Sequence, residues 1–70
     1  MYLIYTKHAK EKIEKRKIVP IWIEETIKWP HLTEHIGNKY VVIRKLNGYT
    51  LKVVYIKENN IKVITCYLIK

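Results

Sequence analysis

The chain has 70 residues, 49% of them hydrophobic and 29% charged, a balance that excludes a disordered segment and suits one small domain over residues 1–70. Fourteen lysines and arginines against six acidic residues give a formal net charge of +8, which attracts polyanions such as RNA, although a solvated lysine-rich surface has the same composition. No apolar run approaches the ~20 residues that span a bilayer and the first residues do not resemble a signal peptide, so we expect a cytoplasmic protein without membrane contact.

The first half of the chain predicts a short strand followed by two helices. Thr6 can cap the first helix with its hydroxyl, and no glycine or proline interrupts the residues up to Arg16. Pro20 suits the first turn of the second helix, which stops before Pro30. The predicted elements are a strand over Met1 to Tyr5, a helix over Lys7 to Arg16 and a helix from Pro20 to Lys28 or Trp29. Their inner stripes are Ala9 with Ile13 and Ile23 with Ile27.

The second half of the chain predicts an antiparallel sheet. Asn47-Gly48 between β-rich runs indicates a hairpin with a two-residue type I′ turn, in which both residues take a positive φ. We interpret residues 31–38 as a connecting loop, whose His31 and His35 lack the Cys or Asp partners of a zinc site. The predicted strands are Lys39 to Leu46, Tyr49 to Lys57 and Ile61 to Ile69. The order β-α-α-β-β-β predicts an α+β fold with two N-terminal helices on one face of an antiparallel sheet.

The alternation of side chains along these strands assigns two faces to the sheet. The helix-covered face takes Tyr40, Val42, Leu51, Val53 and Tyr55, joined by Ile64, Cys66 and Leu68. The opposite face takes Lys45, Lys52, Thr65 and Tyr67 among Val41, Ile43, Val54 and Ile56. This mixture suits a half-exposed surface that receives an anion, and equally a partly covered sheet whose lysines extend to water. Cys66, the single cysteine, is expected to be a buried, unreactive thiol.

The first predicted helix also carries a basic stripe. His8, Lys12 and Arg16 are spaced by four and lie on one side of the helix, with Lys15 and Lys17 nearby. Stacked cations repel one another, so such a stripe suits phosphate binding, although a solvated lysine-rich helix gives the same pattern. Trp22 and Trp29 in the second helix are the right side chains to stack on bases, but packing against the sheet or a partner protein is the expected use.

Several of these residues form a pattern that resembles a known family. The matching run begins Tyr5-Thr6-Lys7-His8-Ala9, continues through Lys12, Ile13 and Arg16 to Ile18, and is followed by Ile23, Ile27 and Pro30. The last two strands match as well, where Val63, Thr65 and Tyr67 form a Val-x-Thr-x-Tyr ending. The pattern resembles a family of small prokaryotic domains of unknown function in the RelE-like (BECR-fold) superfamily of ribonuclease toxins. The family's glycine after the arginine is Lys17 here, which leaves the end of the first helix open.

The resemblance implies a RelE-like fold and metal-independent RNA cleavage without a cofactor. His8 would be the general acid or base, because imidazole can give and take a proton near neutral pH. Arg16 and Lys45 would stabilise the charged phosphorane, with Thr65 and Tyr67 completing the site. The expected RNA-binding residues are Lys12, Lys15, Arg44 and Lys52. The expected partners are RNA, including ribosome-bound mRNA, and an antitoxin protein that covers the basic face.

Three functions follow, in this order: a toxin-like endoribonuclease, an RNA- or DNA-binding module without catalysis, and a protein-interaction domain that uses the tryptophans. Loss of activity on changing His8 or Arg16 would favour the first. Similar small losses at every basic residue would favour the second, and an effect of Trp22 alone the third. The bias toward Lys, Ile and Glu suits a thermophile, and an AT-rich genome produces the same bias. The sequence leaves the oligomeric state open.

Overall fold

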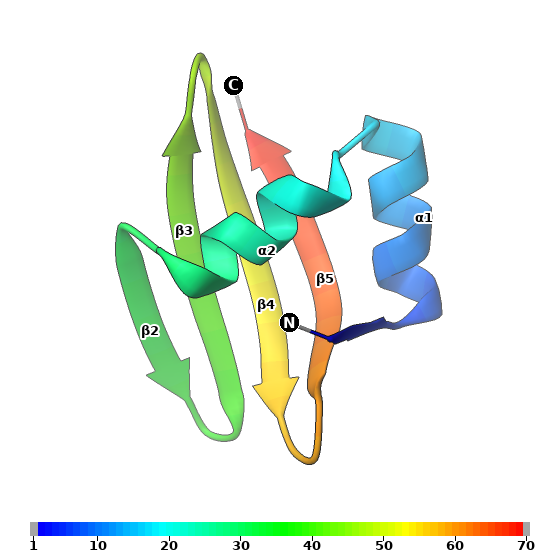
Figure 1. The fold of residues 1–70 in the computed structure, drawn as a ribbon, viewed down its shortest axis with the longest axis vertical. Helices are drawn as coiled ribbons and strands as arrows, with labels where there is room; N and C mark the ends of the chain where they lie inside the picture. Colours follow the sequence, from blue (N-terminus) through cyan, green and yellow to red (C-terminus); the bar gives the residue numbers. More distant parts are fainter. Residues whose placement is uncertain (1, 70) are drawn as a thin grey trace.

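The structure is a computed structural model that describes residues 2–69, so Met1, which was expected in the first strand, lies outside it. It has two helices and a five-stranded sheet, which confirms the α+β class (Figure 1). The elements are β1 Leu3–Tyr5, α1 Lys7–Arg16, α2 Pro20–Lys28, β2 Leu32–Ile36, β3 Lys39–Leu46, β4 Tyr49–Lys57 and β5 Ile61–Ile69. Within residues 2–69, no helix is long and apolar enough to cross a membrane.

The strands lie in the order β1-β5-β4-β3-β2, and the sheet is mixed. The pairs from β2 to β5 are antiparallel as expected, whereas β1 pairs parallel with β5, with Tyr5 opposite Val63. A parallel pair needs a long connection between its strands, and the whole segment from α1 to β4 supplies it. The first and last strands of the chain therefore lie side by side, which brings α1 next to β5 (Figure 1).

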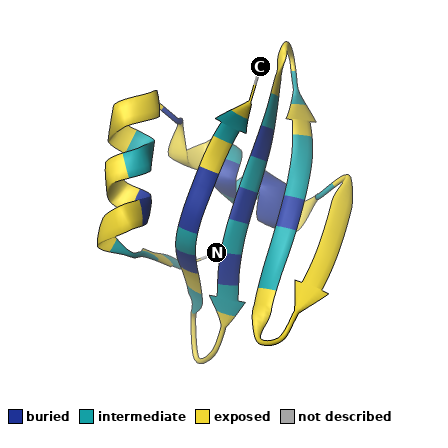
Figure 2. Ribbon diagram, turned by 180° about the vertical axis from the view of Figure 1, so that it is seen from behind, coloured by how far each residue is buried: buried dark blue, intermediate teal, exposed yellow. Residues whose placement is uncertain are grey.

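The prediction of a loop over residues 31–38 is wrong, because β2 forms there. Ile36 lies opposite Lys39, so Gly37 and Asn38 form a two-residue hairpin loop, and Gly37 has a φ of 62°. Gly-Asn between two runs is itself a hairpin signal. All five residues of β2 are exposed, so no buried side of the strand marks it in the sequence (Figure 2).

The predicted hairpin between β3 and β4 is confirmed, with Leu46 opposite Tyr49 across a two-residue turn. The prediction of a type I′ turn is wrong. Gly48 has a φ of 83°, but Asn47 does not adopt a positive φ. A positive φ at the second central residue alone is the pattern of a type II turn, which requires glycine only there.

The core lies between α2 and the sheet. α2 crosses β3 and β4 (Figure 1), and its predicted inner residues Ile23 and Ile27 are buried. Thr26 is also buried, and its hydroxyl donates to the Trp22 carbonyl at 2.7 Å, which satisfies the polar group inside the helix. The buried hydrophobic residues are Ala9, Ile18, Ile23, Ile27, Val42, Leu51, Val53, Tyr55, Val63 and Cys66.

A β-bulge in β5 changes which residues face this core. Tyr55 pairs with Val63 and Val54 pairs with Thr65, so Ile64 has no partner on β4. Val63 therefore takes the core position predicted for Ile64, while Cys66 and Leu68 face the core as predicted. A bulge inserts one residue and shifts the alternation on one side of it, which strict alternation along the strand does not anticipate.

Thr6 attaches the start of α1 to this bulge. Its hydroxyl accepts the Ala9 backbone N–H at 3.1 Å, which confirms the predicted cap, and donates to the Ile64 carbonyl at 2.7 Å. The Thr6 backbone N–H also donates to the Val63 carbonyl at 3.0 Å. One residue thus caps the helix and fixes its first turn beside β5.

The other end of α1 closes on Lys17. This residue adopts the left-handed conformation (φ 54°, ψ 45°). The family pattern described above has glycine at this position. The Lys17 N–H bonds to the Glu14 carbonyl at 3.3 Å and the Ile18 N–H to the Ile13 carbonyl at 2.9 Å, a Schellman motif. Buried Ile18 anchors the motif in the core, so α1 ends at Arg16 as predicted.

Candidate functional site

The basic stripe of α1 lies along an edge of β5. β1 pairs only with the first part of β5, and α1 packs beside the rest (Figure 1). The Lys12 ammonium nitrogen lies 5.2 Å from the centroid of the Tyr67 ring, within the range of a cation–π contact. A hollow of about 230 Å³, here called the Tyr67 hollow, is lined by Lys12, Arg16, Cys66, Tyr67, Leu68 and Ile69. The structure therefore brings together three of the predicted site residues, Lys12, Arg16 and Tyr67.

A second hollow adjoins the first at the C-terminal end of α1. This Tyr49 hollow, of about 370 Å³, is lined by Lys15, Arg16, Lys17, Tyr49 and Leu68. Arg16 and Leu68 line both hollows, so the two are neighbours. Lys15 was predicted to bind RNA. The contribution of Tyr49 could not be found from the sequence, because only the folded sheet brings the β3–β4 hairpin next to the end of α1.

The predicted lysines of the sheet lie on the face turned away from α2, here called the open face. Lys52 is directly opposite Tyr67 on the neighbouring strand, so it flanks the Tyr67 hollow. Lys45 is opposite Thr50, two strands from β5 and thus roughly 10 Å across the sheet from it. Lys52 therefore belongs to the candidate site, whereas Lys45 can reach only a more distant part of a long ligand.

The open face is half apolar and half basic. Val41, Ile43, Val54 and Ile56 are half-buried on β3 and β4, as the alternation predicted (Figure 2). Lys39 and Lys62 lie on the same face by register, and neither was among the predicted site residues. The parity of Lys39 with Lys45 along β3 was the signal that could have found Lys39, whereas Lys62 reaches this face only through the bulge at Ile64.

His8 and Thr65 line neither of the two basic hollows. His8 is exposed one turn before Lys12 and about 12 Å along the helix axis from Arg16, and it lines neither hollow. Thr65 lies opposite Val54 and is only 8% exposed. Its hydroxyl oxygen is buried without a hydrogen-bond partner among residues 2–69. These two residues lie beside the candidate site rather than in its hollows.

Arg44 lies on the other face of the sheet. It alternates with Lys45 along β3 and therefore faces α2, where its Nη1 donates to the Trp29 carbonyl at 2.6 Å. This carbonyl lies just after the last turn of α2, so Arg44 caps the helix end. The geometry gives Arg44 a structural contact and places it away from Lys12, Arg16 and Tyr67.

His31 and His35 have contacts other than a metal ion. The Lys45 backbone N–H donates to His31 Nδ1 at 2.9 Å. His35 stacks on Tyr40 with 4.1 Å between ring centroids, and Tyr40 stacks on Tyr55 at 5.1 Å. In the described part of the chain, no three His, Cys, Asp or Glu side chains are grouped as metal ligands would be.

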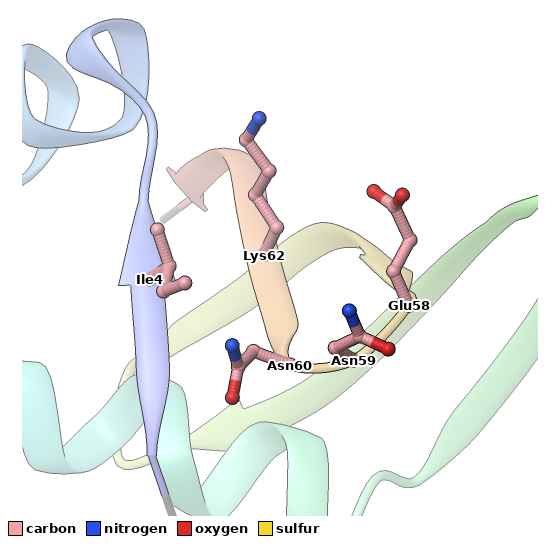
Figure 3. A pocket seen from close by; sticks show the side chains of 5 residues that line it. All are labelled: Ile4, Glu58, Asn59, Asn60 and Lys62. Carbon is pink, nitrogen blue, oxygen red and sulfur yellow. The ribbon is translucent and has the colours of Figure 1, made fainter.

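A third hollow, of about 250 Å³, lies at the opposite end of β5. Figure 3 shows its lining, in which Ile4 extends from β1 and the other side chains surround the β4–β5 turn. The lining residues are Ile4, Glu58, Asn59, Asn60 and Lys62. The lining has one carboxylate and one ammonium group, whose charges cancel, so this hollow has little attraction for a polyanion.

The thiol of Cys66 lies behind the Tyr67 hollow and is buried. Burial raises the pKa of this thiol, and the nearby charge of Lys12 offsets part of the rise. A protonated, inaccessible thiol is a poor nucleophile. The chemistry of the site therefore rests on its cations and aromatic rings.

Three comparisons bear on this chain. A family model described as a domain of unknown function, DUF4258, matches residues 5–68. No curated protein and no solved structure matches the chain. The matched residues include all of α1 and all of β5 up to Leu68, and therefore almost every residue of both basic hollows.

Proposed function

The chain belongs to this DUF4258 family, and we propose that it binds single-stranded RNA along α1 and β5 and cleaves it without a metal ion, as a RelE-like ribonuclease. The observation that carries the proposal is the Lys12–Tyr67 contact beside Arg16. An aromatic ring stacks on a base of any identity, and flanking cations hold the backbone phosphates. This combination of side chains is the usual one for single-stranded nucleic acid.

The surrounding charge supports the same ligand. Lys12, Arg16 and Lys52 lie around Tyr67. The net charge of +8 adds a long-range attraction that raises the rate of encounter with a polyanion. RNA is the substrate class that RelE-like enzymes cleave, and its 2′-hydroxyl supplies the nucleophile that DNA lacks.

The proposed cleavage needs one base, one acid and a stabilised phosphate. The 2′-hydroxyl loses its proton to the base and its oxygen bonds to phosphorus. The bond from phosphorus to the 5′-oxygen breaks, and that oxygen gains a proton from the acid. The products carry a 2′,3′-cyclic phosphate and a 5′-hydroxyl. Arg16 stabilises the extra negative charge on the phosphate, and His8 exchanges one of the two protons.

The position of His8 also favours a second candidate, an RNA-binding module without catalysis. His8 is exposed and lines neither hollow, so the phosphate must lie toward the N-terminal half of α1 for His8 to reach it. Without that placement the same surface binds RNA and leaves it intact.

We also propose an antitoxin protein as a partner, and the open face suggests its chemistry. Val54 and Ile56 are half-buried apolar side chains, and Lys39, Lys45 and Lys52 lie around them. An acidic segment with an apolar side would cover both kinds of group. Such a segment would also lie over Lys52 beside Tyr67, and RNA could not bind there.

The test of the proposed function is a cleavage assay on end-labelled single-stranded RNA with EDTA present, repeated with mRNA on ribosomes. The variants are His8→Ala with Arg16→Ala, and Lys57→Ala as a control that removes one charge at the far end of β4. We expect the parent and the control to leave cyclic-phosphate ends, and the double variant to leave the RNA intact. A gel shift without cleavage in either assay would establish the binding module instead. If the protein causes no gel shift and no cleavage in either assay, an RNA ligand is refuted.

A further inference from the structure

We propose that the Tyr49 hollow is a second phosphate site, so that the RNA ligand spans two successive phosphates on either side of Arg16. The inference rests on the proposed function, because it extends the same RNA beyond the Tyr67 hollow. It makes the ligand a polynucleotide rather than a nucleotide. It also assigns RNA contacts to Lys17, which the sequence placed only near the basic stripe, and to Tyr49, which the sequence did not predict.

The first observation is the charge of this hollow. Lys15, Arg16 and Lys17 are consecutive, and all three line it. No glutamate is paired with any of them within residues 2–69. Three uncompensated cations around one concave site attract an anion and repel one another without it. Because Arg16 also lines the Tyr67 hollow, one arginine lies between the two sites.

The second observation is the backbone of Lys17. Its φ of 54° and ψ of 45° are the left-handed conformation, which glycine adopts without strain and a lysine does not. The Schellman motif at the end of α1 needs only a residue that takes this conformation. The lysine side chain adds nothing to the motif, yet it lines the hollow. Backbone strain retained beside a charged hollow indicates a role for the side chain.

The third observation is the floor of the hollow. Tyr49, whose side chain is 37% exposed, and Leu68 lie beside the three cations. An aromatic ring next to a phosphate site offers a stacking surface for the base attached to that phosphate. The Tyr67 hollow has the same combination of ring and cations. Two adjoining units of ring and cations suit the alternation of base and phosphate along a single-stranded polynucleotide.

A simpler explanation places the same cations at the helix C-terminus only to offset the negative end of the helix dipole. The two explanations make different predictions for the RNA affinity of the Lys17→Gly variant. This substitution removes the strain, which costs more than the dipole interaction of one exposed charge contributes, so both explanations predict a higher melting temperature, by about 4 °C for a domain of this size. Only a phosphate site also predicts weaker RNA binding.

The experiment measures fluorescence anisotropy of labelled decauridylate, and of a dinucleotide with a single phosphodiester, against parent, Lys17→Gly, Lys17→Arg and Lys10→Ala. Lys10 is exposed on α1 and lines neither hollow, so its variant is a matched loss of charge. For decauridylate, we expect Lys17→Gly to bind about fivefold more weakly, with a salt slope lower by about 0.7, while Lys17→Arg binds like the parent. The dinucleotide occupies one site and is expected to lose less affinity.

Each outcome decides between the explanations. If Lys17→Gly binds decauridylate like Lys10→Ala, the Lys17 side chain does not contact RNA and the proposal of a second phosphate site is wrong, while the proposed function stands. If Lys17→Gly loses as much affinity for the dinucleotide as for decauridylate, the proposal that the ligand spans two phosphates is wrong. If the parent itself binds no RNA, the second site and the proposed function are both refuted.

Discussion

The ammonium nitrogen of Lys12 lies 5.2 Å from the centroid of the Tyr67 ring, and this contact joins α1 to the part of β5 that β1 does not pair with. At an exposed site such a contact contributes about 0.5–1 kcal/mol. Its functional meaning is larger, because a base stacked on Tyr67 would have its phosphate near Lys12. The relationship depends on Thr6, whose hydroxyl fixes the start of α1 at the β5 bulge.

We expect Tyr67→Ala to weaken binding of single-stranded RNA by about tenfold, because stacking on one aromatic ring contributes about 1–3 kcal/mol per base. Tyr67→Phe keeps the ring and should bind like the parent. Fluorescence anisotropy with decauridylate measures both variants. Tyr2→Ala is the control, since Tyr2 is 73% exposed and lines neither basic hollow. An equal loss for Tyr2→Ala would mean that Tyr67 has no special role.

Arg44→Ala should lower the free energy of unfolding by about 1 kcal/mol, because it removes the 2.6 Å hydrogen bond to the Trp29 carbonyl from an exposed helix end. RNA affinity should stay close to that of the parent, since Arg44 faces α2. Urea denaturation gives the stability, and the anisotropy assay gives the affinity. A loss of affinity as large as that of Arg16→Ala would show that Arg44 reaches the RNA.

Thr6→Ala should cost about 1–2 kcal/mol of stability, because it removes the cap on the Ala9 N–H and the bond to the Ile64 carbonyl. Thr6→Ser keeps the hydroxyl and should recover most of the loss. Thermal unfolding monitored by circular dichroism compares the three proteins. If serine and alanine are equally destabilising, the methyl group and not the hydroxyl holds the helix in place.

The protein should lose stability at alkaline pH through buried phenol groups. Burial raises the pKa of Tyr55, with a further rise from Tyr40, and burial raises that of Tyr5, with further rises from Glu24 and Cys66. The folded state thus keeps these protons to a higher pH than the unfolded chain, whose tyrosines titrate near pH ~10. Their contribution is complete below that pH and is lost as the pH rises through the folded values.

Urea denaturation at several pH values between about 9 and 11 measures this loss. The free energy of unfolding of the parent should decline over the range, and that of Tyr55→Phe should decline less. A decline of equal slope in the two proteins would assign the alkaline loss to other groups.

The sequence predicted the elements that local chemistry marks. Thr6 and Pro20 identify both helix starts, and Asn47-Gly48 identifies one hairpin. β2 was missed because Glu34 lies between Leu32 and Ile36 on one side of the strand and interrupts the apolar alternation, and the Gly37-Asn38 signal was taken for part of a loop. The bulge at Ile64 and the parallel pairing of β1 depend on contacts between distant parts of the chain, which one sequence does not show.

The candidate site, like the fold, was predicted only in part. The spacing of Lys12 and Arg16 places both on one side of α1, and strand alternation puts Lys52 and Tyr67 on the same face of the sheet, as the structure has them. That Tyr67 meets Lys12 follows from the packing of α1 against β5, which spacing within either element does not specify. Arg44 was placed among the RNA-binding residues with Lys52, although it alternates with Lys45 along β3 and therefore faces the other side of the sheet.

The most direct test of the central claim is a titration of nitrogen-15-labelled protein with unlabelled decauridylate, followed by amide chemical shifts. Binding between α1 and β5 predicts the largest shifts at Lys12, Arg16 and residues 66–69, with β2 and Trp29 little changed. Shifts confined to β2 and the end of α2, or no shifts at RNA concentrations that saturate other single-strand binders, would contradict it.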